Sequence, residues 1–151
     1  MQFIAAILPL FAALAPTFSA PVTPAPIMGS IAAPTSDVIV SPGSSIPFKF
    51  NVVNWCEEGY NNFKVFLTET EPTIDDVDSE GNISTALVSF GEFTIANFGL
   101  PASGTPPPSS LIVPVSAASG PAFLTVVEPF SSCPGGVTGE IGLTSVPITM
   151  Q

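Results

Sequence analysis

The residues best suited to bind a ligand gather in one short segment, Trp55 to Tyr60. Trp55 and Tyr60 are the only tryptophan and tyrosine of the chain, and Glu57 and Glu58 lie between them. Sugars stack on exposed aromatic rings while nearby polar groups fix their orientation. These four residues therefore form a candidate glycan-binding site. In the alternative reading, which we favour, Trp55 packs on a disulfide and Tyr60 caps the core, because large aromatics beside a disulfide usually pack.

The chain has two cysteines, Cys56 and Cys133. An even count in a secreted chain predicts a single disulfide. Cys56 follows the second expected strand, and Cys133 follows the penultimate one. In an immunoglobulin-like order these two loops lie at the same end of the domain. We therefore expect the bond to join loop to loop at one pole instead of crossing the core.

Carboxylates are the only other groups whose chemistry resembles that of a catalytic site. Glycoside hydrolysis requires two carboxyl groups about 5 to 9 Å apart across a cleft. Because most of the carboxylates lie in expected turns, we predict no catalytic residue and retain a carboxylate-dependent hydrolase as the last alternative. The residues concerned are Glu57, Glu58, Asp75, Asp76, Glu92, Glu128 and Glu140.

Six of the twelve acidic residues fall between Glu69 and Glu80. Asp76 to Gly81 resembles the beginning of an EF-hand loop, but Glu80 stands at position five and Leu87 at position twelve, where that loop needs Asp or Asn and a bidentate Glu. We expect a solvated acidic loop in preference to an irregular calcium site, and hence no metal site.

Asn82-Ile83-Ser84 is the one N-x-S/T sequon of the chain. In a secreted protein this triplet predicts N-glycosylation at a surface position. We therefore expect Asn82 to be glycosylated.

The composition excludes several classes of function. The chain of 151 residues has two lysines, no arginine, no histidine and twelve acidic residues, so its net charge is −10. Without histidine there is no Ser-His-Asp or Cys-His relay and no imidazole metal site. Two lysines cannot neutralise a phosphate backbone or an anionic membrane surface, so we expect neither nucleic acid nor membrane as a partner. We expect no cofactor.

The N-terminus has the features of a secretory signal. Residues 3–15 form an apolar run that is too short to span a membrane and is followed by small residues. We expect a signal peptide at 1–20, a flexible Pro/Ala-rich lead-in at 21–35 and a folded domain at 36–151. The product would be secreted and extracellular.

The elements that must position these residues are all expected to be β-strands. Short alternating apolar runs are separated by Gly, Pro, Ser and Asn, and no segment has a sustained helical period. The pattern predicts an antiparallel, immunoglobulin-like or fibronectin-like sandwich of seven to eight strands. A change of parity in the last strand predicts a bulge near Thr144-Ser145. The expected strands are 37–40, 46–52, 63–68, 83–90, 93–96, 111–115, 123–128 and 139–150.

The chain resembles two groups of known proteins. Asn54 to Tyr60 followed by Phe63 to Leu67, with Asn97 to Pro101 further along, resembles small secreted proteins of filamentous fungi, of the basidiomycete kind. The opening around Ser41-Pro42-Gly43 is similar to immunoglobulin-like domains of fungal cell-wall proteins. The resemblance implies a source and a compartment and carries no catalytic residues.

We therefore expect a secreted, non-enzymatic protein with a structural or adhesive role outside the cell or at the cell wall. Its expected partners are extracellular glycans or cell-wall components. The first alternative is a carbohydrate-binding module that uses Trp55 and Tyr60.

Overall fold

The computed structural model describes residues 22–131, 133 and 139–151, and its regular secondary structure is β. No α-helix occurs within those residues, and one 3₁₀ turn, η1, covers Ile74–Asp76. The prediction of an all-β fold is therefore confirmed. The strands are β1 (Thr23–Pro24), β2 (Ser30–Ala33), β3 (Val38–Val40), β4 (Ser45–Pro47), β5 (Lys49–Asn51), β6 (Tyr60–Thr68), β7 (Val88–Ala96), β8 (Ser110–Ile112), β9 (Gly120–Phe130) and β10 (Glu140–Met150).

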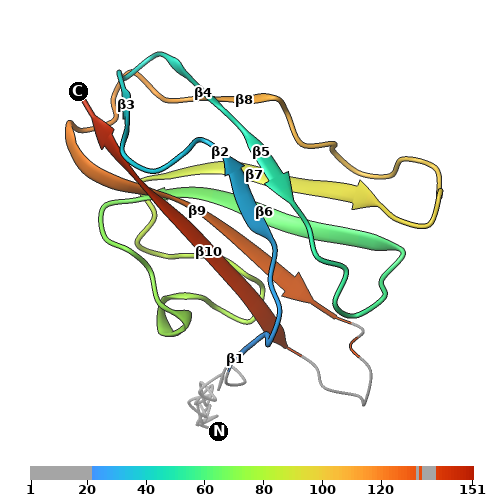
Figure 1. The fold of residues 1–151 in the computed structure, drawn as a ribbon. Coiled ribbons are helices and arrows are strands. Elements are labelled where there is room, and N and C mark those ends of the chain that lie inside the picture. The colour runs from blue at the N-terminus through green and yellow to red at the C-terminus, as the bar shows by residue number, and fades with distance from the viewer. Residues whose placement is uncertain (1–21, 132, 134–138) are drawn as a thin grey trace, which may run out of the picture.

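The largest sheet has the order β1-β10-β9-β6-β7, and β3 also pairs with β10 (Figure 1). The central pairs β10-β9, β9-β6 and β6-β7 are antiparallel. However, β1 and β3 run parallel to β10, one near each end of it. The prediction of an antiparallel fold is therefore confirmed in part: the large sheet is mixed, because the N-terminal part of the chain runs along β10 in the same direction.

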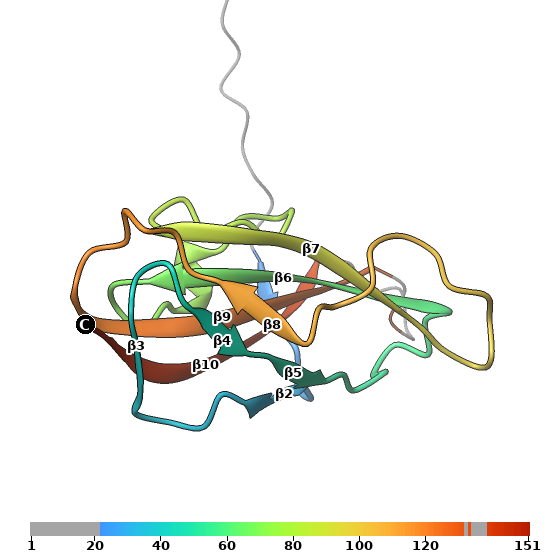
Figure 2. The ribbon, with the colours of Figure 1, turned by 90° about the horizontal axis from the view of Figure 1, so that it is seen from above.

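Four short strands form a second layer, in which β2 pairs with β5 and β4 with β8. Seen from above, this layer lies across one face of the large sheet (Figure 2). The expected strand 46–52 is present as β4 and β5 on either side of Phe48. Its predicted alternation holds, since Ile46, Phe48 and Phe50 are buried between exposed neighbours.

The main core fills the space between the two layers. Phe48 and Phe50 pack against Phe63 and Phe93 of the large sheet, with ring centroids 5.0 to 6.5 Å apart. A continuous second group joins β3, β4 and β10 through Val40, Ile46, Ile148 and Met150, among others. Aromatic rings of this size bury large apolar areas, and this burial holds the two layers together.

The opposite face of the large sheet is also covered. Phe66, Val127 and Ile141 pack against Val77 and Ile83 of the segment between β6 and β7. Because both faces are covered, apolar residues of both parities are buried in the central strands.

This two-sided burial corrects the bulge predicted near Thr144-Ser145. β10 pairs with β9 without a register shift from Glu140 to Met150. Ile141 packs on one face of the sheet, whereas Ile148 and Met150 pack on the other. The switch of parity therefore arises because the buried apolar side chains of β10 lie on one face of the sheet at its beginning and on the other face at its end. A register shift does occur elsewhere, in β6-β7.

Other boundaries also moved. The expected strands 83–90 and 93–96 are one strand, β7, while Ile83 forms only an isolated bridge with Val77. The expected flexible lead-in carries β1 and β2, which pair with β10 and β5. Its composition hid this order because strands of two to four residues depend on their partners more than on their own pattern. The expected signal peptide lies outside the described residues.

Candidate functional site

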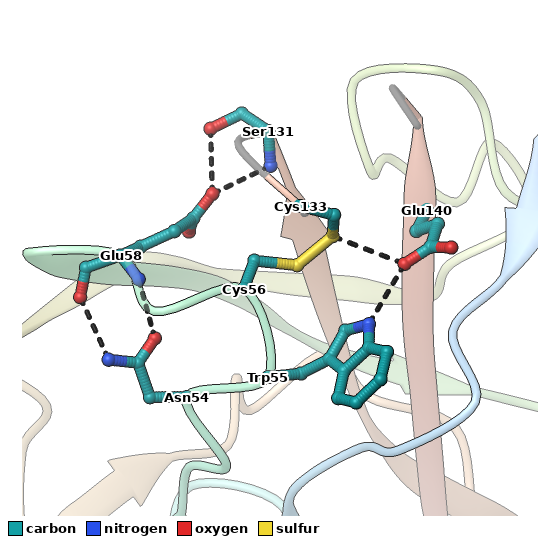
Figure 3. Close-up of a disulfide and its surroundings, with 7 residues drawn as sticks. All are labelled: Asn54, Trp55, Cys56, Glu58, Ser131, Cys133 and Glu140. Atoms are coloured by element: carbon teal, nitrogen blue, oxygen red, sulfur yellow. Dashed lines mark hydrogen bonds between the residues drawn. A yellow bond between two sulfur atoms is a disulfide. The ribbon is translucent and has the colours of Figure 1, made fainter. Parts of the chain in front are cut away.

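The Cys56–Cys133 disulfide is present and joins two loops (Figure 3). Cys56 lies between β5 and β6, and Cys133 lies between β9 and β10. Both are buried together with Ala25 and Phe130 in a small cluster beside the main core. The prediction of a loop-to-loop bond is confirmed. We call Asn54 to Tyr60 with Ser131, Cys133 and Glu140 the disulfide pole.

Trp55 lies across the disulfide pole toward β10. Its indole Nε1 donates to Glu140 Oε2 at 3.1 Å, and the side chain remains 36% exposed. The same carboxylate oxygen lies 3.1 Å from Cys133 Sγ. Because both sulfurs are in the disulfide, this second approach is a contact without a donated proton. The ring is thus fixed at its polar edge and open to solvent over part of its area.

Tyr60 lies on another side of the same loop. It is half-buried at the beginning of β6, and its hydroxyl donates to the Pro101 carbonyl at 3.2 Å. Trp55 contacts β10, whereas Tyr60 contacts the loop that follows β7. The polar atoms of the two rings therefore have different partners, Glu140 for Trp55 and Pro101 for Tyr60.

The two glutamates between the rings differ in role. Glu58 Oε1 accepts hydrogen bonds from the amide and hydroxyl of Ser131, at 2.8 and 2.9 Å. The Glu58 amide and carbonyl are bonded to the Asn54 side chain. Glu58 therefore links the two loops by hydrogen bonds. Glu57 is exposed and has a left-handed backbone with φ of 53°.

The loop after β7 supplies site residues that sequence reasoning missed. The Asn97 side chain donates to the Glu58 carbonyl at 2.8 Å, and the Asn97 amide donates to the Gly59 carbonyl. This contact fixes the loop on the disulfide pole and presents Phe98, which is 73% exposed with φ of 55°. A large aromatic rarely adopts that backbone, so the position marks a candidate contact residue. The available sequence signal was the Asn-Phe-Gly triplet.

The acidic loop is fastened mostly by its own hydrogen bonds. Asp78 Oδ1 accepts from the amides of Glu80 and Asn82, and Lys64 Nζ donates to the Glu80 carbonyl and to Asn82 Oδ1. Burial acts to raise the pKa of Asp78, but the Asn82 and Glu80 hydrogen bonds and the Lys64 charge outweigh it and lower the pKa. The Asp76 pKa is also lowered, by hydrogen bonds from the backbone and then the side chain of Thr73.

Within the described part of the chain, this loop brings no three metal-ligand atoms together. The one such group is Cys56, Cys133 and Glu140, where both sulfurs are held in the disulfide. Asn82 is half-buried, and its side-chain nitrogen donates to the Asp78 carboxylate. Its glycosylation stays a prediction.

The carboxylates considered for hydrolysis lie in separate places. Asp75 and Asp76 are on η1, Glu92 is exposed on β7, and Glu140 bonds to Trp55. Glu128 is 2% exposed, and its Oε2 accepts the Gly29 amide at 2.7 Å. Burial raises the pKa of Glu128 to about 7, against the opposing effect of the Gly29 hydrogen bond. This carboxyl is therefore enclosed instead of facing a substrate.

A cavity of about 330 Å³ lies at the other end of β9 from Cys133. Glu69 is its one charged lining residue, and Leu87 provides an apolar wall. The remaining lining comes from residues 118–122.

Comparisons with known proteins do not assign the chain to a family. No protein-family model matches the chain, and no curated protein is similar to it. Among the described residues, no helix is long and apolar enough to cross a membrane.

Proposed function

We propose that the chain is a secreted, non-enzymatic module with an immunoglobulin-like sandwich and a structural or adhesive role outside the cell or at the cell wall. The observation that carries this proposal is the order of the strands. In seven-stranded immunoglobulin-like domains, the third, sixth and seventh strands lie in one sheet. In the other sheet, the second strand pairs with the fifth. Here β10-β9-β6 and β4-β8 correspond to those two sets.

The disulfide supports the extracellular part of the proposal. Disulfides persist in oxidising compartments and are rare in the cytosol. The Cys56–Cys133 bond is buried between two loops of the disulfide pole, where it holds the loops that would contact a partner. Sites for adhesion are typically carried by loops on a rigid β scaffold.

Secretion is tested by expressing the full chain in a eukaryotic host with a secretory pathway. The expected product is found in the medium or on the wall, begins after residue 19 or 20 and is oxidised at both cysteines. Fractionation into medium, wall and cytosol distinguishes a released from a wall-associated role. A full-length, reduced protein confined to the cytosol would refute the proposal.

The second candidate is a carbohydrate-binding module that uses Trp55 and Tyr60. The observation that favours it is the position of Trp55, whose ring is partly open while Glu140 fixes its edge. A ring fixed in this way loses little freedom when a sugar stacks on it. Tyr60 gives this candidate less support, because its hydroxyl bonds to Pro101 and not to a group near Trp55.

A panel of insoluble polysaccharides tests this candidate. Retention on one polysaccharide that is lost in Trp55→Ala, Tyr60→Ala would support it. Ile112→Ala is the matched control, because Ile112 is exposed on β8 in the other layer. Equal retention of the control and the double variant, or no retention of the wild type, would refute glycan binding at this site.

A further inference from the structure

Glu128 is a buried carboxyl whose hydrogen bonding is incomplete. It lies on β9 and is 2% exposed. Oε2 accepts the amide of Gly29, a residue 99 positions earlier, at 2.7 Å. Oε1 is also buried and has no hydrogen-bond partner within the described residues. A buried ionised oxygen without a donor is strongly unfavourable, whereas a neutral carboxyl is tolerated.

The N-terminal segment Ala25 to Ile31, here called the covering segment, lies over this carboxyl. A methyl group built on Gly142 of β10 would come within 3.0 Å of Met28 Cβ and 3.1 Å of Glu128 Oε2. Thr144 Oγ1 donates to the Gly29 carbonyl at 3.0 Å. Met28, Gly29, Gly142 and Glu128 therefore form one close-packed contact, and lifting the covering segment would admit water to the carboxyl.

The covering segment is attached at its two ends, since the Ala25 amide donates to the Ile141 carbonyl at 2.9 Å beside the disulfide, and Ile31 packs against the main core. β1 pairs with β10 over two residues, and β2 pairs with β5 with a register shift. Short edge elements of this kind open locally at much lower free energy than the core. The state of Glu128 can therefore influence the opening of this segment without unfolding the domain.

No charged side chain on the surrounding elements compensates for an ionised Glu128. The covering segment contains no titratable residue. Glu140 of β10 bonds to Trp55, Lys64 of β6 bonds to Glu80 and Asn82, and Lys49 of β5 is exposed. The remaining titratable side chain on these strands, Tyr60, donates its hydroxyl to Pro101.

We propose that Glu128 is a pH-operated latch for the covering segment, which stays closed while the carboxyl is neutral and opens when the carboxyl ionises. Burial raises the pKa of Glu128 from 4.5 to about 7 in the closed state. In an open, hydrated state the pKa returns toward 4.5. The opening equilibrium therefore rises with pH between these two values and levels off above the higher one, by roughly thirtyfold from pH 5.5 to 8.5. The covering segment is thus closed at acidic pH and opens more often at neutral and alkaline pH.

Amide hydrogen exchange of the oxidised protein tests the latch. Exchange of residues 25–31 is measured at pH 5.5 and 8.5 and divided by the intrinsic rate at each pH. The wild type is expected to lose protection in this segment by roughly thirtyfold while β6 and β9 stay protected. The Gly29 amide resonance should titrate near the same pH.

Two variants make the outcome specific. Glu128→Gln keeps the shape and the acceptor but cannot ionise, so its segment should stay protected at both pH values. Glu92→Gln, which changes an exposed carboxylate on β7, should behave as the wild type. Protection that is independent of pH in the wild type, or an equal pH dependence in Glu128→Gln, would overturn the proposal. If Glu128→Gln does not fold, the titration of the Gly29 amide in the wild type decides the question.

Discussion

The disulfide pole and the Glu128 contact fasten distant parts of the chain in different ways. The disulfide joins residues 77 positions apart by a covalent bond, and Glu58 adds two hydrogen bonds from Ser131. The Glu128 contact joins residues 99 positions apart through one hydrogen bond to a carboxyl that lacks a second partner. The disulfide holds its two loops together at any pH at which it stays oxidised. The Glu128 contact depends on a proton, so the two should respond to different perturbations.

The largest effect is expected from removing the disulfide. A Cys56→Ser, Cys133→Ser variant should lose about 4 kcal/mol of unfolding free energy in urea, because the bond restricts the unfolded chain over a long loop. Reduction of the wild type serves as the matched control and should give a similar loss. A loss below about 1 kcal/mol in both would mean that the hydrogen bonds of the pole hold the loops by themselves.

The pH dependence of stability should isolate the Glu128 contact. Its folded pKa is raised from 4.5 to about 7, so the folded state holds the proton more tightly. The associated stability is complete below 4.5 and is lost as pH rises to about 7, by about 3 kcal/mol. Urea unfolding at pH 4.5 and 8 measures this. Glu128→Gln should remove the decline, whereas the double cysteine variant should retain it.

The acidic loop should have the opposite pH response. The pKa values of Asp76 and Asp78 are lowered from 3.8, so the stability that they contribute is present above 3.8 and is lost as pH falls through the lower folded values. Together with Glu128, this predicts maximal stability at roughly pH 4 to 5. A monotonic rise of stability up to pH 8 would contradict the Glu128 assignment, whereas stability that does not fall as pH drops below 3.8 would contradict the assignments of Asp76 and Asp78.

A smaller effect is expected at the acidic loop from Lys64→Met. This change removes the bonds from Lys64 to the Glu80 carbonyl and to Asn82, and should lower the unfolding free energy by about 1 kcal/mol. Lys49→Met is the matched control, because the other lysine is exposed on β5 and should change stability by less than about 0.5 kcal/mol. Equal effects of the two changes would show that net charge, not the bonds of Lys64, determines the result.

The smallest effects should distinguish the two exposed aromatics near the disulfide pole. Phe98→Ala should change the unfolding free energy by no more than about 0.5 kcal/mol, because most of the ring is in solvent. Trp55→Ala should destabilise by about 1 kcal/mol, since it loses the Glu140 hydrogen bond and packing at the disulfide. If both changes are neutral, Trp55 is free to act as a binding ring in the same way as Phe98.

Much of the β structure could be predicted from local pattern. The alternation through Ile46, Phe48 and Phe50 located a strand region whose buried face was correct. The expected strand 123–128 lies within β9, whose dense apolar run is covered on both sides by the clusters around Leu124 and Val127. The same reasoning did not find β1 and β2. Their order depends on β10 and β5, and a window of two to four residues carries no periodicity.

The candidate site, like the fold, could be predicted only in part from the sequence. The residue types placed Trp55, Tyr60, Glu57 and Glu58 beside a disulfide, and that bond is present. They could not show that the two rings have different neighbours or that Glu58 is bonded to Ser131. The role of Asn97 and Phe98 at the site was not predicted, because it comes from a contact with a loop about 40 positions away.

By itself, the sequence determined the β class, the lone pairing of Cys56 with Cys133 and the absence of histidine and arginine chemistry. These follow from residue identity and short-range alternation, which need no knowledge of partners. Tertiary structure alone decided that β3 runs parallel to β10, that β10 changes its buried face without a bulge, and that Glu128 is enclosed. The physical reason is that parallel pairing and the burial of a carboxyl depend on segments about a hundred residues apart, whose approach no local pattern encodes.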